Sequence, residues 1–315
     1  MALEDHTIAI FAPHLTLTVT IEAGREDGPE DIHIHPGGQG FWVARMLRHL
    51  KEKPLLCGPV GGESGGVLRS LISQWGIDLS PFEVQESSPA IVYDRRSGQR
   101  TSIAGSPAPG LARHELDDAY GRILDHALSS EVVVITGQSS EIVPVDTYRR
   151  LGHDLASADV PVVGDLHGRE LEAFLEGGHL DLLKISDEDL IEDGKLEGED
   201  EDMALDQLHR LRDSEARRVV ISRGARPALA LIEGVTYRVT GPDLEPADYR
   251  GAGDSMTAGL AAGLRRGLGA EELLRLASGA GAANVTRHGL GSASDDLIPR
   301  LAERVEIEVL TPMTQ

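Results

Sequence analysis

From residue 112 onward, the chain alternates short apolar runs with longer segments in which apolar residues recur at helical spacing. The apolar runs are residues 132–135, 160–163, 180–185 and 219–222, and helices are expected near 112–128, 145–158 and 169–176. Runs without polar alternation are typical of strands that are buried on both faces. The pattern therefore predicts an α/β protein with a mostly parallel central sheet and helices on both faces.

The first third of the chain departs from this rhythm and predicts a second, smaller sheet. Residues 16–22 and 31–35 alternate strictly between polar and apolar side chains, and a polar turn at 95–98 separates short strand-like runs. Strands that alternate have one buried and one solvated face, and a short polar turn between two of them indicates a hairpin. We therefore expect lid strands within 14–36 and 79–104.

Length and charge limit the possible partners. The chain has 315 residues, enough for a full hydrophobic core, and we expect a single domain over residues 1–315. Its 52 acidic residues exceed its 30 basic residues, giving a formal net charge of −22, so nucleic acid and anionic membranes are excluded as partners. Cys57 is the single cysteine, and the sequence shows neither a signal peptide nor a long apolar run. These features predict a cytoplasmic protein.

Gly251, Ala252, Gly253 and Asp254 form a small-residue turn just before a helix-compatible stretch. Backbone N–H groups at such a helix N-terminus have no acceptor within the helix, and the helix dipole adds positive potential there. The turn is therefore a candidate anion site. Asp254 permits two interpretations, because an acid in the first turn can cap the helix or can accept a proton from an attacking hydroxyl group.

A second glycine turn, residues 36–40, opens a helix whose apolar stripe runs over residues 43–50. Neither turn is a standard nucleotide motif: the turn at 251–254 lacks the Gly-Lys-Ser/Thr of a P-loop, and no G-x-G-x-x-G follows the first strand. Two glycine turns far apart in the sequence, one of them with an acid, indicate a transfer enzyme with separate acceptor and donor sites.

These motifs resemble the signatures of the PfkB (ribokinase-like) carbohydrate kinases. Residues 36–45, PGGQGFWVAR, are similar to the family's first signature, and residues 251–259, GAGDSMTAG, to its second, with Asp248 upstream and GAGAAN at 279–284 downstream. The resemblance covers nearly the whole chain and is strongest to the branch of 1-phosphofructokinase and tagatose-6-phosphate kinase. It implies a ribokinase-like fold, with an α/β core, a small β-sheet lid, ATP at the end of the sheet and sugar between core and lid.

The same resemblance implies an activity. The chain is expected to use ATP and Mg²⁺ and to transfer the γ-phosphate to a hydroxyl of a sugar or sugar-like small molecule. Asp254 is then the general base, and Gly251, Ala252 and Gly253 form the anion hole. These roles agree with phosphoryl transfer, which needs in-line positioning and charge stabilisation more than covalent chemistry.

On the nucleotide side, residues 184–189, KISDED, stand where the family has Lys-Pro-Asn-x-x-Glu. The resemblance therefore implies nucleotide contacts from Lys184 and Ser186. It also implies a metal ligand at Asp189, where the charge of the family's glutamate is kept. The amide of the family's asparagine is lost.

Two further nucleotide-side elements are altered. Ser222 and Gly224, in SRGARP, stand for the family's Ser/Thr-x-Gly-x-x-Gly, with Pro227 in place of the last glycine. Proline fixes φ and has no N–H, so the loop must take a different path there. Asn284 falls where the family lines its adenine pocket, and the alternative is an ordinary surface amide.

The acceptor side departs further from the family. Thr16 stands at the place of an aspartate, Gln39 and Trp42 replace a lysine and an asparagine, and Ser88 stands at the place of a lid arginine. None of these side chains supplies a cation for a phosphate group, so an acceptor without phosphate is favoured. The residues expected to bind the acceptor are Thr16, His35, Gly37, Gly38, Gln39 and Trp42.

Three other groups of residues leave alternatives open. His33 and His35 share one strand face, so they could bind a metal or could face the acceptor pocket from the lid. Asp165 follows a core strand and could line the site or cap the next helix. The arginines within 95–100 are expected at a solvated hairpin tip.

The leading hypothesis is therefore a small-molecule kinase. The alternative is a degenerate family member that binds a nucleotide or sugar without efficient phosphorylation. A nucleotide-dependent oxidoreductase is disfavoured because the dinucleotide fingerprint is missing. Exposed edges of the lid strands favour a homodimer through the lid.

Overall fold

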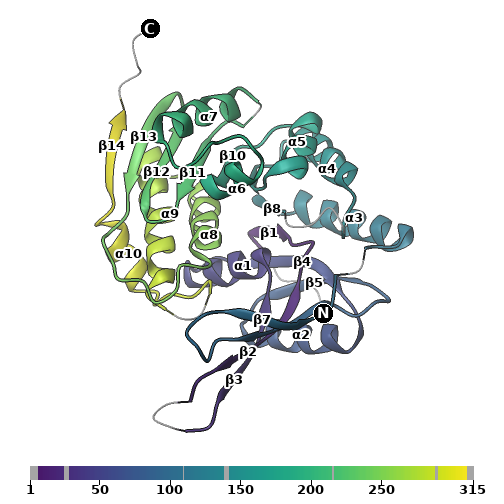
Figure 1. Ribbon diagram of the computed structural model, residues 1–315. Coiled ribbons are helices and arrows are strands. Elements are labelled where there is room, and N and C mark those ends of the chain that lie inside the picture. The colour runs from purple at the N-terminus through teal and green to yellow at the C-terminus, as the bar shows by residue number, and fades with distance from the viewer. Residues whose placement is uncertain are drawn as a thin grey trace.

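The computed structural model describes residues 6–24, 28–108, 110–137, 142–214, 216–287 and 290–310, and within these residues it contains a large and a small sheet (Figure 1). The strands of the large sheet are β1 (Ile8–Phe11), β4 (Pro54–Val60), β5 (Asp78–Glu83), β8 (Val132–Thr136), β9 (Val162–Asp165), β10 (Leu182–Ser186), β11 (Val219–Arg223), β12 (Arg226–Ile232), β13 (Val235–Thr240) and β14 (Glu306–Leu310). The strands of the small sheet are β2 (Thr16–Glu22), β3 (Asp31–Gly37), β6 (Ala90–Asp94) and β7 (Thr101–Gly105).

The large sheet has the order β14-β13-β12-β11-β10-β9-β8-β1-β4-β5. All neighbours from β5 to β11 pair in parallel, and β12, β13 and β14 continue the sheet in antiparallel fashion. The predicted α/β class with a mostly parallel central sheet is therefore confirmed. Because the parallel strands run in one direction, their carboxyl ends meet at one edge, where ligands bind in open α/β sheets.

Helices cover both faces of this sheet (Figure 1). They are α1 (Gln39–His49), α2 (Gly62–Gln74), α3 (Arg113–Leu128), α4 (Val145–Ser157), α5 (Gly168–Gly177), α6 (Asp187–Glu192), α7 (Glu201–Asp213), α8 (Ala252–Arg265), α9 (Ala270–Val285) and α10 (Leu297–Ala302). Consecutive residues of a strand point to opposite faces. Accordingly, Ile8 and Ile10 pack with α1, α2, α8, α9 and α10, whereas Ala9 and Phe11 pack with α3, α4, α5 and α7. In the described part of the chain, none of these helices has the length and apolarity needed to cross a membrane.

Two elements differ from the sequence-based expectation. Residues 78–83, most of which lie in the range expected for the lid, form β5 and pair in parallel with β4 in the core. Residues 306–310, for which no strand is predicted above, form β14 on β13. Residues 305–309, VEIEV, alternate between apolar and polar side chains, as is typical of a strand with one solvated face, so this strand has a local sequence signal as well as a pairing partner.

The small sheet, in the order β3-β2-β6-β7, projects from the core as a lid (Figure 1). Its polar face points inward, since Thr16, Thr18 and Thr20 of β2 are buried, whereas Ile32 and Ile34 of β3 are 60% and 53% exposed. This is the reverse of an ordinary half-buried sheet. A threonine face covering the core is suited to a polar cavity rather than to a hydrophobic interface.

The helix that begins at the Gly251 turn, α8, is held against α9 by small residues. A methyl group added at Gly259 would lie 2.6 Å from Cα of Ala277, so the two backbones are too close for any side chain there. Gly121, in the middle of α3, is exposed and has no atom within 4 Å of the corresponding position.

Gly259→Ala should therefore destabilise the fold by about 1–3 kcal/mol, because α8 and α9 must move apart. Gly121→Ala is the matched control and should stabilise by up to about 1 kcal/mol, the ordinary gain of alanine over glycine in a helix. Urea unfolding of both variants measures the difference. Equal stabilisation by the two substitutions would contradict the close packing of α8 on α9.

Candidate active site

A polar pocket of about 210 Å³ lies at the carboxyl end of the parallel strands, and the described residues that line it come from four different parts of the chain. They are Gln39, Asp165, His167, Lys184, Ser186, Asp189, Gly251, Gly253 and Asp254. The two glycine turns identified in the sequence therefore meet here, since α1 begins at Gln39 and α8 follows Gly251. The pocket brings together Asp254, Gln39, Lys184, Ser186 and Asp189 from the expected site.

The turn before α8 has the geometry expected of an anion site. Gly251 has a φ of 75°, in the left-handed region that favours glycine, and its carbonyl accepts from the N–H of Ser255. The N–H groups of Gly253 and Asp254 have no acceptor among the described residues. These two donors therefore remain available for an anion in the pocket.

Asp254 lies beside these donors with its carboxyl group in the pocket. Burial and the negative charge of Asp165 raise the pKa of Asp254, the ammonium group of Lys184 opposes them, and the resulting value is about 7. A carboxyl group with this pKa can both hold and release a proton near neutral pH.

A buried network fixes the floor of the pocket. Asp165, at the end of β9, accepts hydrogen bonds from Nζ of Lys184 at 3.3 Å and from Oγ1 of Thr257 at 2.6 Å. Asp165, Lys184 and Thr257 are all buried. Of the two interpretations of Asp165, the pocket-lining one agrees with this position.

Lys184 lies directly under the turn, since a methyl group at Gly253 would be 2.8 Å from its Nζ. Burial would lower the pKa of Lys184, but the charges of Asp165, Asp254 and Asp189 raise it, so the ammonium form is maintained. Glycine at position 253 therefore allows the ammonium group of Lys184 to lie close to the backbone of the turn, because a side chain there would have to displace it.

Ser186 and Asp189 form a capping box at the start of α6. Oγ of Ser186 accepts from the N–H of Asp189 at 3.0 Å, and one carboxylate oxygen of Asp189 accepts from the N–H and Oγ of Ser186 at 3.0 and 2.6 Å. The other carboxylate oxygen has no hydrogen bond within the described residues. Asp189 therefore has one oxygen available to the pocket.

The remaining nucleotide-side residues lie outside the described lining of the pocket. Ser222 is on β11, in register with Ser186 of β10, and Gly224 forms the exposed turn that follows, with a φ of 59°. Asn284 is fully buried; its Nδ2 donates to the carbonyl of Arg250 and its Oδ1 accepts from the N–H of Gly291, each at 2.7 Å. The amide of Asn284 thus braces the Gly251 turn from behind instead of facing the pocket, and it is not the surface amide of the alternative interpretation.

On the acceptor side, Gln39 is the expected residue that reaches the pocket, and its buried Oε1 has no hydrogen-bond partner in the described part of the chain. Gly37 and Gly38 form the turn before α1, where Gly38 has a φ of 110°. The pocket lining does not include Thr16, whose Oγ1 is hydrogen-bonded to the ring of His14.

His35 and Trp42 are also absent from that lining. Trp42 is buried in the core, with its ring centroid 5.6 Å from that of His35 across the joint of lid and α1. The ring of His35 is hydrogen-bonded to the carbonyl of Pro36, and His33 pairs with Asp31. Among the described residues, no group of three or more His, Cys, Asp or Glu side chains is arranged to hold a metal ion, so the metal interpretation of His33 and His35 receives no support.

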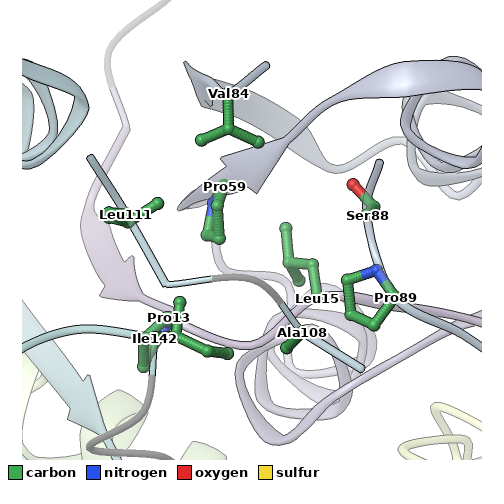
Figure 2. A pocket seen from close by; sticks show the side chains of 9 residues that line it. All are labelled: Pro13, Leu15, Pro59, Val84, Ser88, Pro89, Ala108, Leu111 and Ile142. Carbon is green, nitrogen blue, oxygen red and sulfur yellow. The ribbon is translucent and has the colours of Figure 1, made fainter. Parts of the chain in front are cut away.

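Ser88 lines a different cavity, which is apolar and lies at the base of the lid (Figure 2). Leu15, Pro89 and Ala108 surround it together with residues from the core, and Oγ of Ser88 accepts from the N–H of Gly61 at 3.1 Å. Because none of the described residues that line this cavity is charged, it has the character of a packing gap at the base of the lid rather than of a site for a polar substrate.

The tip of the lid hairpin is tied to the Gly251 turn, contrary to the expectation of a solvated tip. Arg95 pairs with Glu22 at 3.3 Å and with Asp248 at 3.6 Å, and its side chain is only 18% exposed. Asp248 also accepts from Nε and Nη2 of Arg250, at 2.9 and 2.5 Å. The sequence contains no local signal for this contact, because it joins residues about 150 positions apart.

Comparison with known proteins agrees with this geometry. The profile of the pfkB family carbohydrate kinases matches residues 15–297. The chain belongs to this family. It is thus a phosphotransferase that uses ATP and a sugar hydroxyl as acceptor, and the predicted family and enzyme class are confirmed.

Two curated relatives and two solved structures illustrate the similarity of this pfkB family member. The ATP-dependent 6-phosphofructokinase isozyme 2 of Mycobacterium tuberculosis is 28% identical, covering 85% of this chain and 79% of the relative. The 1-phosphofructokinase of Bacillus subtilis is 26% identical, and the match covers 87% of this chain and 88% of the relative. The structure of phosphofructokinase-2 from Escherichia coli in complex with potassium has a TM-score of 0.84 at 22% identity. The match covers 95% of this chain and 99% of that chain. The structure of a possible 1-phosphofructokinase from Thermotoga maritima has a TM-score of 0.82 at 18% identity. The match covers 97% of this chain and 100% of that chain. The structures confirm the predicted ribokinase-like fold.

The raised pKa of Asp254 predicts that this residue costs stability at alkaline pH. Because the fold favours the protonated carboxyl group, the contribution of Asp254 to the free energy of unfolding is fully present below the ordinary pKa of 3.8. This contribution is lost as the pH rises through about 7. Asp254→Asn should therefore raise Tm at pH 8, and the gain should shrink towards pH 5. Thermal unfolding at several pH values measures this effect. Asp146→Asn, at an exposed first-turn acid of α4, is the control, and a Tm of Asp254→Asn equal to wild type throughout would contradict a destabilised carboxylate.

Proposed function

We propose that Asp254 is the general base of the kinase reaction and that Gly251, Ala252 and Gly253 form the anion hole for the transferring phosphoryl group. The observation that carries this proposal is a carboxyl group with a pKa of about 7 beside two unpaired N–H donors in one pocket. A base is most effective when its pKa is near the working pH, and preorganised donors stabilise the charge that develops on the phosphoryl oxygens.

The donor nucleotide is held by Lys184, Ser186, Ser222 and Gly224 in this proposal. The position of Lys184 next to Gly253 supports it, because the buried ammonium group, hydrogen-bonded to Asp165, attracts the phosphate chain. Asn284 contributes by fixing the carbonyl of Arg250, and so the backbone before Gly251.

The residues present fit a magnesium ion that arrives with the nucleotide. Mg²⁺ is usually bound through one or two carboxylates together with substrate phosphates and water, and Asp189 has one oxygen available for this role. When bound, the ion supplies charge neutralisation between phosphate oxygens. We place the enzyme in the cytoplasm, where ATP is available and the buried thiol of Cys57 stays reduced.

The acceptor is proposed to be a sugar or related alcohol without a phosphate group, held by Gly37, Gly38 and Gln39. Gln39 supports this, since its unpaired Oε1 can accept from a substrate hydroxyl near Asp254. In this proposal Thr16, His35 and Trp42, which lie near the joint of the lid and α1, are further contacts of the acceptor. The names of the relatives point instead to phosphorylated sugars, so the acceptor panel must contain both classes.

Asp254→Asn should lower turnover by about 10² to 10⁴-fold, the usual contribution of a general base, while nucleotide binding persists. The measurement is coupled ADP release with a panel of free sugars, sugar phosphates and nucleosides. Asp146→Asn, an exposed acid in the first turn of α4, is the matched control and should keep full activity. Turnover of Asp254→Asn close to that of wild type would refute the role of the base, and preference for phosphosugars would refute the proposed acceptor.

We also propose a homodimer through the lid. The outer face of β3 exposes Ile32 and Ile34, and β3 and β7 are the two edges of the small sheet within the described residues. Exposed aliphatic side chains next to free strand edges are costly in water unless a partner covers them.

Light scattering after size exclusion should show a dimer for wild type and a monomer for the double variant Ile32→Glu, Ile34→Glu, because charges would be buried at the interface. Leu128→Glu, at an exposed leucine at the end of α3, is the control and should leave the dimer intact. A monomeric wild-type protein at micromolar concentration would refute the lid dimer.

A further inference from the structure

His167 lies in the same pocket as Asp254, although neither the sequence motifs nor the proposed function assigns it a role. It follows β9 by two residues and precedes α5, where Gly168 has a φ of 55°. The side chain of His167 makes no capping hydrogen bond to α5. Capping of its own helix therefore does not explain the orientation of the ring.

The ring is instead held from behind by Asp193, at the end of α6. Nδ1 of His167 donates to Oδ1 of Asp193 at 3.2 Å, and Oδ2 of Asp193 accepts from the N–H of Gly168 at 2.7 Å. Nε2 of His167 has no hydrogen-bond partner among the described residues. A histidine with one nitrogen fixed by a carboxylate offers the other nitrogen in a defined direction, here within the pocket lining.

Among the protein groups of the described pocket lining, carboxylates outnumber ammonium groups. Three carboxylates, those of Asp165, Asp189 and Asp254, line it together with the single ammonium group of Lys184, which is already hydrogen-bonded to Asp165. A phosphate chain entering this pocket meets more negative than positive charge unless another protein group is positive. His167 is the one other ionisable side chain in the described lining.

Its surroundings favour the protonated form. Burial would lower the pKa of His167, but the hydrogen bond to Asp193 and the charges of Asp189, Asp193 and Glu192 raise it overall. The other charged groups facing the pocket are Asp165 on β9, Lys184 on β10 and Asp254 at the start of α8, and Lys195 lies 3.9 Å from Asp193.

We propose that His167 is a phosphate-binding residue, which donates from Nε2 to a phosphate oxygen of the bound nucleotide, with Asp193 as its positioning residue. This inference rests on the proposed nucleotide site but adds a contact that the glycine turns do not provide. Charge-assisted hydrogen bonds to phosphate are about twice as strong as neutral ones, so the contact should be measurable in binding.

The first test is calorimetric binding of ADP, with and without Mg²⁺ and without any acceptor. His167→Asn should weaken ADP binding by about 10-fold, the lower end of the range for a hydrogen bond to a charged group. His153→Asn is the matched control, because Nδ1 of His153 also pairs with a carboxylate, that of Asp154 at 3.0 Å, but its side chain is 69% exposed on α4. This control should bind ADP as wild type does.

The second test follows the imidazole of His167 by NMR. Its pKa should rise when ADP binds, and Asp193→Asn should lower it in the free protein while the N–H of Gly168 keeps an acceptor. ADP affinity of wild type should fall as the pH rises through the pKa of His167, and this pH dependence should be flattened in His167→Asn.

These outcomes separate the inference from the proposed function. Failure of the wild-type protein to bind ADP would overturn the nucleotide site itself. Wild-type binding with an unchanged affinity in folded His167→Asn, or an imidazole pKa that ADP does not move, would overturn only the role of His167. A loss in His167→Asn with no loss in His153→Asn, together with the pKa rise, supports it.

Discussion

The active site depends on the interactions of one buried carboxylate, that of Asp165, with Lys184 and Thr257. It joins three elements that are distant in sequence, because it lies at the end of β9, accepts from Lys184 of β10 and accepts from Thr257 of α8. Buried charges are tolerated only when they are paired and hydrogen-bonded, so neither Asp165 nor Lys184 can leave the other without a large penalty. The cation, the donor turn and Asp254 are therefore held in one fixed arrangement before any substrate binds. Preorganisation of this kind is what phosphoryl transfer requires from a protein.

Much of this arrangement could be predicted from the sequence. The apolar runs identified the parallel strands from β8 to β11, with shifts of one or two residues at their ends, because burial on both faces leaves a clear composition signal. The two glycine turns also predicted that Gln39 and Asp254 lie at the starts of helices. Glycine indicates a turn because its backbone is free to adopt it, and a helix that follows such a turn begins with unpaired N–H groups. The motif around Lys184 and Asp189 then indicated the third side of the pocket.

What could not be predicted depends on contacts between distant residues. The amide of Asn284 joins the backbone of Arg250 to that of Gly291, and no local pattern specifies such a pair. The ion pair of Arg95 likewise depends on Asp248, which is distant in the sequence. Which face of the lid turns inward is likewise not predicted by the sequence, because alternation shows that a strand has two unlike faces but not which of them turns towards the core.

The contact between Arg95 and Asp248 has a consequence for movement of the lid. Any movement that raises the lid hairpin away from the Gly251 turn must separate this pair, and dissolved ions screen its attraction only weakly because both side chains are largely buried. The same Asp248 accepts from Arg250, next to the first glycine of the turn, so departure of Arg95 alters the charge beside that backbone. Movement of the lid and the electrostatic potential at the start of α8 are thereby linked through one carboxylate.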